Sequence, residues 1–200
     1  MKIYRRFGKR VFDISATLLG GILLLPLLLL IAIWIKINSK GPLLYVQKRV
    51  GKDFEEFKIY KFRSMIVDAD KVGPSVTSGD DTRITKVGKI LRRTKIDELP
   101  QLFNVLKGDM SLVGPRPEVM KFVVLKKDEY RKVLSVKPGI TDNAAIVYRD
   151  EEMLMEEYEE KEKAYIDIVL PKKIELYNEY IDNISFISDV KLILRTLKVI

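Results

Sequence analysis

An uncharged segment near the amino terminus limits what this chain can fold into more than any other feature. Residues 14–35 contain no Asp, Glu, Lys or Arg, are dominated by Leu and Ile, and lie between Asp13 and Lys36. At about 1.5 Å per residue, a helix of about 22 residues reaches across a hydrocarbon core of about 30 Å. The segment is longer than a signal-peptide core and lacks a small-residue cleavage site, so we expect it to stay in the mature protein.

Two features argue against a simple membrane crossing. Pro26, near the middle, removes one helical hydrogen bond and predicts a kink. Basic residues flank the segment on both sides, so the positive-inside rule gives no clear orientation or assigns both ends to the cytoplasm. These residues are Lys2, Arg5, Arg6, Lys9 and Arg10 before the segment, and Lys36, Lys40, Lys48 and Arg49 after it. A bent, re-entrant helix satisfies both observations, and an ordinary span with a tolerated proline stays open as the alternative.

The composition restricts the chemistry. The chain has 200 residues, with 36 Lys or Arg against 28 Asp or Glu, and a net charge of +8. This balance suits an anionic partner, but the cations are scattered among carboxylates, so we expect no nucleic-acid binding. The absence of Cys and His excludes disulfides, thiolate metal sites, a Cys nucleophile and every Ser-His-Asp arrangement. Any chemistry must therefore use carboxylates, Lys, Arg, Tyr, hydroxyl groups or a hard metal ion.

Short elements are predicted in the first part of the soluble body. Apolar positions between residues 44 and 62 predict strands that form a hairpin around Gly51, and the turn-rich residues 67–83 predict a loop. Thr85 is expected to cap a helix. Asp97 is expected to cap the next one, over residues 98–107, with Pro100 in its first turn and Gly108 at its end.

Helices dominate the second part. We expect a helix over residues 118–133, a turn at residues 138–139 and a solvated acidic helix over residues 150–163. The fold class is therefore α+β, mostly helical, with a small β-hairpin.

The last stretch has an amphipathic pattern. Ile187, Val190, Ile193, Leu194 and Leu197 recur at helical spacing, and Lys191, Arg195 and Lys198 share another face. This pattern is typical of an interfacial helix on anionic lipid, and equally of a surface helix packed on a core. Both readings stay open.

Three basic or acidic clusters could carry chemistry, and each also has a simpler explanation. In residues 61–65, Lys61 and Arg63 alternate with apolar residues, as in an exposed basic strand. In residues 92–101, Asp97 and Glu98 follow three cations; a helix start favours the ionised carboxylate, yet Asp is also an ordinary cap. In residues 110–117, two prolines and a glycine present Arg116, which suits phosphate recognition or a plain rigid turn.

Taken together, these clusters resemble the bacterial sugar transferase family, the small monotopic phosphoglycosyl transferases that initiate bacterial glycans. The matching runs are residues 9–13, 47–51, 60–65, 81–85, 97–101, 103–110, 114–117 and 137–141. They occur in family order over residues 5–145, and the DELPQ run at 97–101 followed by GDMSLVGPRP at 108–117 is the most specific part.

The resemblance implies an active site at the cytoplasmic membrane surface. It implies a re-entrant membrane helix and interfacial helices, with Asp97 as nucleophile, Glu98 as its partner, and Mg²⁺ held on Asp97. Matching charged positions imply substrate-binding roles for Lys61, Arg63, Arg92 and Arg116, and a weaker one for Arg149. Two departures are visible: Leu25 rather than Ser precedes Pro26, and residues 142–149 replace the family's Gly-Leu-Ala-Gln-Val-Asn-Gly-Arg run.

The implied organisation is a basic amino terminus and re-entrant helix over residues 1–40, followed by a catalytic domain over residues 41–200 with a carboxy-terminal interfacial helix. The implied reaction moves a sugar-1-phosphate from a UDP-sugar to undecaprenyl phosphate through an aspartyl phosphosugar, at the cytoplasmic face of the bacterial inner membrane. It requires the Asp97 carboxylate to be anionic, surrounded by cations and not buried. A membrane-tethered basic scaffold and an inactive relative are the alternatives, and the sugar, the glycan and the oligomeric state, including a homodimer, stay open.

Overall fold

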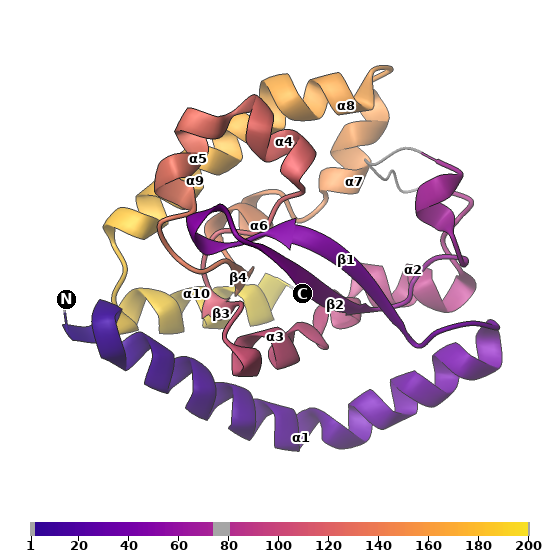
Figure 1. The fold of residues 1–200 in the computed structure, drawn as a ribbon. Coiled ribbons are helices and arrows are strands. Elements are labelled where there is room, and N and C mark those ends of the chain that lie inside the picture. Colours follow the sequence, from indigo (N-terminus) through magenta and orange to yellow (C-terminus); the bar gives the residue numbers. More distant parts are fainter. Residues whose placement is uncertain (1–2, 74–80, 200) are drawn as a thin grey trace.

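The computed structural model describes residues 3–73 and 81–199, and it confirms an α+β, mostly helical fold (Figure 1). A loop was predicted over residues 67–83, and residues 74–80 of it lie outside the described residues. Within the described ranges the strands form two small sheets, β1 with β2 and β3 with β4. Helices surround both sheets and supply most of the core.

The apolar segment forms one long helix. A π-helical turn, η1 (Tyr4–Gly8), continues into α1 (Lys9–Asn38), which runs through Pro26 without interruption. By length and composition the 35 residues Tyr4–Asn38 could cross a membrane. Only 11% of the most apolar 18-residue stretch within them is buried in the protein. Figure 1 shows α1 bowed beneath the body, with both ends turned toward it. The expected proline bend is therefore present, but as a curve in a continuous helix.

The amino-terminal end of α1 is bonded to the body through buried polar groups. The Asp13 carboxylate is 3% exposed and accepts hydrogen bonds from Ser111 Oγ and the Leu112 backbone N–H, both at 3.0 Å. Arg10 Nη1 donates to the Val105 carbonyl at 2.6 Å, and Lys9 pairs with the buried Asp189 at 2.6 Å. A buried carboxylate with these partners fixes the direction in which the helix leaves the body.

The carboxy-terminal end of α1 is held as well. Ile31 and Ile35 are buried in one cluster with Phe62 and Leu91 of the body. Arg63, 5% exposed, donates from Nη2 to the Ser39 carbonyl at 2.8 Å and from Nη1 to the Lys40 carbonyl at 3.0 Å. The two ends of α1 are therefore attached to the same folded body.

The predicted hairpin is confirmed. Strands β1 (Leu44–Val50) and β2 (Glu56–Phe62) pair antiparallel, and the turn between them contains Gly51 and the short helix η2 (Lys52–Phe54). Side chains alternate along β2, so Ile59 and Lys61 share one face of the strand. Ile59 packs into the core, and Lys61 lies at the end that meets the acidic pair.

A second, parallel pair was not predicted. Strands β3 (Ser111–Val113) and β4 (Gly139–Thr141) lie side by side, so the turn expected at residues 138–139 is wrong in that Gly139 begins a strand. The strands meet where Gly114 and Gly139 touch, and a Cβ on Gly139 would lie 2.1 Å from the Gly114 nitrogen. Only glycine allows this approach.

The helices around the acidic pair correct one prediction. Thr85 caps α2 (Lys86–Arg93), as expected, by accepting from the Gly88 N–H at 2.9 Å. Asp97 does not cap a helix: it lies inside the short turn η4 (Ile96–Glu98), and α3 (Gln101–Lys107) begins later. Gly108, with φ of 99°, ends α3 as predicted.

Two predicted helices are each divided. The helix expected over residues 118–133 is α4 (Met120–Leu125) and α5 (Lys127–Val133), broken at Lys126, which lets Phe122 and Tyr130 enter the same core cluster. The acidic helix expected over residues 150–163 is α7 (Glu151–Leu154), η5 (Met155–Glu157) and α8 (Lys161–Ala164), because Met155 turns into the core.

The carboxy-terminal helix packs one face on the body, as expected of a surface helix, and its interfacial role stays a prediction. Leu192 and Asp189 of α10 (Phe186–Val199) are buried against the body, whereas Ile187, Leu194 and Leu197 are exposed. The remaining elements are η3 (Ala69–Lys71), α6 (Asn143–Val147), η6 (Tyr165–Val169) and α9 (Leu170–Asp182).

Candidate active site

The acidic pair lies on the tight turn η4, between α2 and α3. Lys95 has φ of 53°, a left-handed conformation that reverses the chain after α2. This reversal carries Asp97 and Glu98 inward, and both are buried, at 7% and 8% exposure. Two adjacent buried carboxylates require compensation by positive charge.

Glu98 receives that compensation directly. Its Oε1 accepts from Lys61 Nζ at 2.8 Å, its Oε2 accepts from Arg116 Nη1 at 3.0 Å, and Arg116 Nη2 also contacts Oε1. Burial alone would raise the pKa of the Glu98 carboxyl, but the charges of Arg116 and Lys61 outweigh it and hold that pKa well below its usual range. Glu98 is therefore a fixed anion that positions two cations.

Asp97 is in a different situation. Its Oδ1 is buried, and no hydrogen-bond donor reaches it within the part of the chain that the structure describes. Burial raises the pKa of the Asp97 carboxyl to about 6, against the opposing charges of Lys61, Arg92 and Arg116 and with the help of the negative charge of Glu98. Asp97 is thus mostly ionised at neutral pH, close to cations, and has an oxygen free for another partner.

The expectation of an unburied Asp97 is wrong for this structure. The side chain is 7% exposed and Oδ1 is enclosed, because the turn directs it between the hairpin and the Arg116 loop. The neighbouring cations that the same interpretation required are present. A substrate therefore has to displace neighbouring groups to reach Oδ1.

Arg116 is presented by the loop after β3. The loop is tied to β4 by hydrogen bonds from the Gly114 N–H to the Thr141 carbonyl at 3.0 Å and from the Gly139 N–H to the Pro115 carbonyl at 2.9 Å. Pro115 and Pro117 restrict the backbone on both sides of Arg116. The guanidinium thus reaches Glu98 from a rigid loop.

The structure separates the predicted site residues into two groups. Lys61 and Arg116 contact Glu98, and Arg92 acts on Asp97 through its charge. Arg63 points elsewhere, because β2 ends at Phe62 and the Arg63 guanidinium binds the carbonyls that follow α1. Arg149 is exposed in the turn between α6 and α7, and the strongest charges acting on Asp97 come from other residues.

Asp142 is a site residue that the sequence reasoning missed. It follows β4, caps α6 by accepting from the Ala145 N–H at 2.8 Å, and is 1% exposed. Burial raises the pKa of its carboxyl to about 6, opposed by the charge of Arg116, and its Oδ2 has no hydrogen-bond partner among the described residues. Parallel strands end at one edge of a sheet, so recognising β3 and β4 as a pair would have placed Asp142 beside Arg116.

Asp97 is the residue of this site that could contribute a ligand to a divalent cation. The described residues contain no cluster of three or more Asp, Glu, His or Cys side chains that could hold a metal alone. Mg²⁺ commonly takes one or two carboxylates, several waters and substrate phosphates, so a complete protein cage is not required. The free Oδ1 of Asp97 can supply such a ligand, whereas the Glu98 oxygens are already bound by Lys61 and Arg116.

Three curated relatives align with nearly all of this chain. A UDP-N-acetylgalactosamine-undecaprenyl-phosphate N-acetylgalactosaminephosphotransferase of Aeromonas hydrophila is 39% identical, covering 97% of this chain and 44% of the relative. A UDP-glucose:undecaprenyl-phosphate glucose-1-phosphate transferase of Escherichia coli K12 is 40% identical, covering 96% and 39%. An undecaprenyl-phosphate galactose phosphotransferase of Salmonella typhimurium is 35% identical, covering 98% and 40%.

The chain thus spans less than half the length of these three relatives. A family model, described as bacterial sugar transferase, matches residues 4–200 of this chain. That match includes α1, the acidic pair and the Arg116 loop. The chain therefore belongs to the bacterial sugar transferase family.

Proposed function

We propose that the chain transfers a sugar-1-phosphate from a UDP-sugar to undecaprenyl phosphate, as the first membrane step in the assembly of an exopolysaccharide, O-antigen or glycoprotein glycan. Family membership supports this assignment, as do the names of the three relatives, each an undecaprenyl-phosphate sugar transferase. Those names specify N-acetylgalactosamine, glucose and galactose, so the proposal assigns the donor class and not the sugar.

The observation that carries the proposal is the unequal environment of the two adjacent carboxylates. Glu98 is neutralised by Lys61 and Arg116, while Asp97 keeps one oxygen without a hydrogen bond among the described residues. A nucleophilic carboxylate needs an available lone pair, and its neighbour can supply fixed geometry. Asp97 is accordingly the nucleophile, and Glu98 holds the cations that face it.

The proposed reaction has two displacements at one phosphorus. An Asp97 carboxylate oxygen bonds to the phosphorus nearer the sugar, the bond to the bridging oxygen breaks, and UMP leaves with that electron pair. A phosphate oxygen of undecaprenyl phosphate then bonds to the same phosphorus, and the bond to Asp97 breaks. The carboxylate is regenerated, and the product is a sugar linked to the lipid through a diphosphate.

The protein has to offset the repulsion between a carboxylate and a diphosphate. Lys61, Arg92 and Arg116 lie around Asp97 and supply positive charge for the phosphate oxygens. Mg²⁺, bound through Asp97, would add Lewis-acid stabilisation of the same oxygens. The burial of Asp97 means that the donor uncovers Oδ1 as it binds, which also excludes water from the acyl phosphate.

The attachment of α1 at both ends supports a re-entrant arrangement, which we assign to the cytoplasmic leaflet of the bacterial inner membrane from the family resemblance. Lys9 and Arg10 bond the first turn of α1 to the body, and Arg63 bonds the chain just after its last turn. A helix held at both ends by one folded body leaves and re-enters the same side of a bilayer. We accordingly assign residues 1–40 to the membrane element and residues 41–200 to the catalytic domain, and the proposed reaction requires its site to meet the phosphate of the lipid acceptor.

The nucleophile is tested with Asp97→Asn in the full chain, purified in detergent. The variant should bind UDP-sugar but form no covalent phosphosugar adduct detectable by mass spectrometry of the intact protein, and it should release no UMP. Arg131→Gln, at an exposed position on α5 whose ion pair is with Asp128 and not with the acidic pair, is the control and should behave as wild type. Normal UMP release by the Asn variant would remove Asp97 as the nucleophile.

Topology is tested separately with single cysteines, which is possible because the chain has no Cys of its own. Arg5→Cys and Lys40→Cys should react with an impermeant maleimide from the same side of sealed inverted vesicles. Reaction from opposite sides would establish an ordinary span. A membrane-tethered scaffold or an inactive relative would instead release no UMP with any member of a UDP-sugar panel.

A further inference from the structure

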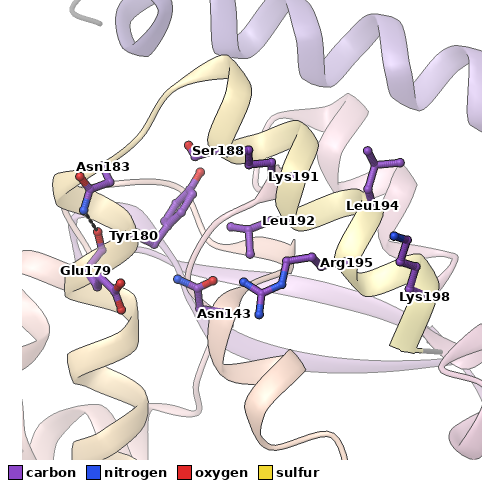
Figure 2. Close-up of a pocket in the computed structure, with 10 residues that line it drawn as sticks. All are labelled: Asn143, Glu179, Tyr180, Asn183, Ser188, Lys191, Leu192, Leu194, Arg195 and Lys198. Atoms are coloured by element: carbon purple, nitrogen blue, oxygen red, sulfur yellow. Dashed lines mark hydrogen bonds between the residues drawn. The ribbon is translucent and has the colours of Figure 1, made fainter.

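A groove outside the candidate active site lies between α9, α10 and the start of α6. Figure 2 shows its lining, with Glu179 and Asn183 at the end of α9, Asn143 on α6, and Lys191, Arg195 and Lys198 on α10. Its volume is about 460 Å³, and none of Lys61, Asp97, Glu98 or Arg116 contributes to it. It is therefore a separate surface feature.

The groove is positively charged. Lys191, Arg195 and Lys198 follow one another at helical spacing and are exposed, and Glu179 is the only acidic residue that lines the groove among the described residues. Figure 2 shows the Arg195 side chain extending from α10 toward Asn143. Three cations against one carboxylate leave a net charge of +2, which favours an anionic ligand.

Apolar side chains border the same groove. Leu194 lines it at 54% exposure, and Leu197, also on α10, is 69% exposed. The start of α10 packs against α1, where the Phe186 ring meets Phe12 at 5.3 Å between centroids. The cations thus lie on the same helix as exposed apolar side chains, and the first turn of that helix contacts α1; cations beside exposed apolar residues are typical of a helix at a lipid interface.

We infer that this groove binds the headgroup of an anionic phospholipid whose phosphodiester carries a polyol, as in phosphatidylglycerol. The positive charges of Arg195 and the two lysines attract the phosphate, and the side chains of Asn143, Asn183 and Glu179 can hydrogen-bond the headgroup hydroxyls. A phosphomonoester such as that of the lipid acceptor has no headgroup hydroxyls for these side chains to bind. The inference rests on the membrane attachment in the proposed function, not on the transfer reaction.

The test is a titration of the full chain in detergent with phosphatidylglycerol or phosphatidylcholine, followed by native mass spectrometry. The groove variant is Lys191→Gln, Arg195→Gln and Lys198→Gln. The control variant removes the same charge from α5, α8 and α9 by Arg131→Gln, Lys163→Gln and Lys172→Gln. Near a membrane surface each cation contributes about fivefold to the attraction of anionic lipid, so the groove variant should lose about a hundredfold in phosphatidylglycerol affinity. The control should retain it.

A second readout locates the lipid. Leu194→Cys, with no other thiol in the chain, should react more slowly with a neutral maleimide in phosphatidylglycerol vesicles than in phosphatidylcholine vesicles. The groove substitutions should abolish that difference. Equal phosphatidylglycerol affinity of the groove and control variants, or equal retention of phosphatidylcholine by wild type, would overturn the proposal. Phosphatidic acid or inorganic phosphate competing as well as phosphatidylglycerol would overturn the headgroup assignment.

UMP release measured in parallel keeps this inference separate from the proposed reaction. A groove variant that releases UMP in detergent but loses phosphatidylglycerol binding supports the groove. A wild-type chain that binds phosphatidylglycerol but never releases UMP removes the proposed reaction alone.

Discussion

Replacing Asp97 by Asn should abolish transfer. It should also raise the free energy of unfolding relative to wild type, by an amount that grows as the pH rises. The folded protein raises the pKa of this carboxyl from 3.8 to about 6, chiefly by burial. A raised pKa means that ionised Asp97 opposes folding: its contribution is most favourable below the unfolded pKa and is lost as the pH rises through about 6. A shift of about 2 units corresponds to about 3 kcal/mol at neutral pH.

The pH dependence isolates this effect from the other consequences of the substitution. An Asn amide introduces donors that can cost about 1–3 kcal/mol when buried without partners, but that cost does not change with pH. Between about pH 4.5 and pH 7.5 the free energy of unfolding of Asp97→Asn should therefore rise by about 2 kcal/mol relative to wild type. Urea unfolding in detergent, monitored by far-UV circular dichroism at several pH values, measures this difference.

The adjacent residue provides a matched control with the opposite sign. Glu98→Gln removes a carboxyl whose pKa is held well below its usual range and leaves Lys61 and Arg116 without their partner. It should destabilise the protein at neutral pH by about 3–5 kcal/mol, and by less as the pH falls and the wild-type carboxylate becomes protonated. The assignment of a buried, destabilised carboxylate at position 97 would be refuted by either of two results. The free energies of unfolding of wild type and Asp97→Asn could differ by the same amount at every pH, or the difference could shrink as the pH rises.

Further predictions concern activity. The value of kcat/KM for UMP release should fall about tenfold per pH unit below about pH 6, since protonated Asp97 is not nucleophilic; a rate that stays constant to pH 5 would contradict this. EDTA should abolish UMP release and excess Mg²⁺ should restore it, whereas full activity in EDTA would exclude the metal. Arg116→Gln should lower kcat/KM about 10²-fold or more and also lower the melting temperature, because buried Glu98 loses a partner; initial rates are measured below the melting temperature of the variant. Arg63→Gln should mainly lower the free energy of unfolding, by about 2–3 kcal/mol, through its lost bonds to the end of α1.

Features with a local cause could be predicted from the sequence. Thr85 caps α2 and Gly108 ends α3 because each residue type satisfies helix-terminal groups within a few positions of itself. The hairpin of β1 and β2 follows from apolar residues on both sides of a Gly-containing turn. Lys61 and Arg116 were identified by family motif, and the structure brings both to Glu98.

Features that depend on contacts between distant segments could not be predicted. Strands of three residues are too short for a periodic signal, so the pair β3 and β4, and with it Asp142, was missed. Asp97 was expected to cap a helix because the left-handed conformation of Lys95 is not encoded by a Gly or Asn. Lys61 and Arg63 look equivalent in sequence, but β2 ends at Phe62, between them. Lys61 therefore contacts Glu98, whereas Arg63 binds the carbonyls that follow α1.

The attachment of α1 at both ends has a consequence for the range of bilayers in which the protein can work. A helix that crosses a membrane must match the hydrocarbon thickness, and a mismatch costs fractions of a kcal/mol per Å. In the proposed re-entrant arrangement, a helix that Lys9 and Arg63 hold to one body has no far end to match. If that arrangement holds, UMP release should not change when lipids with shorter or longer acyl chains replace one another in the vesicles.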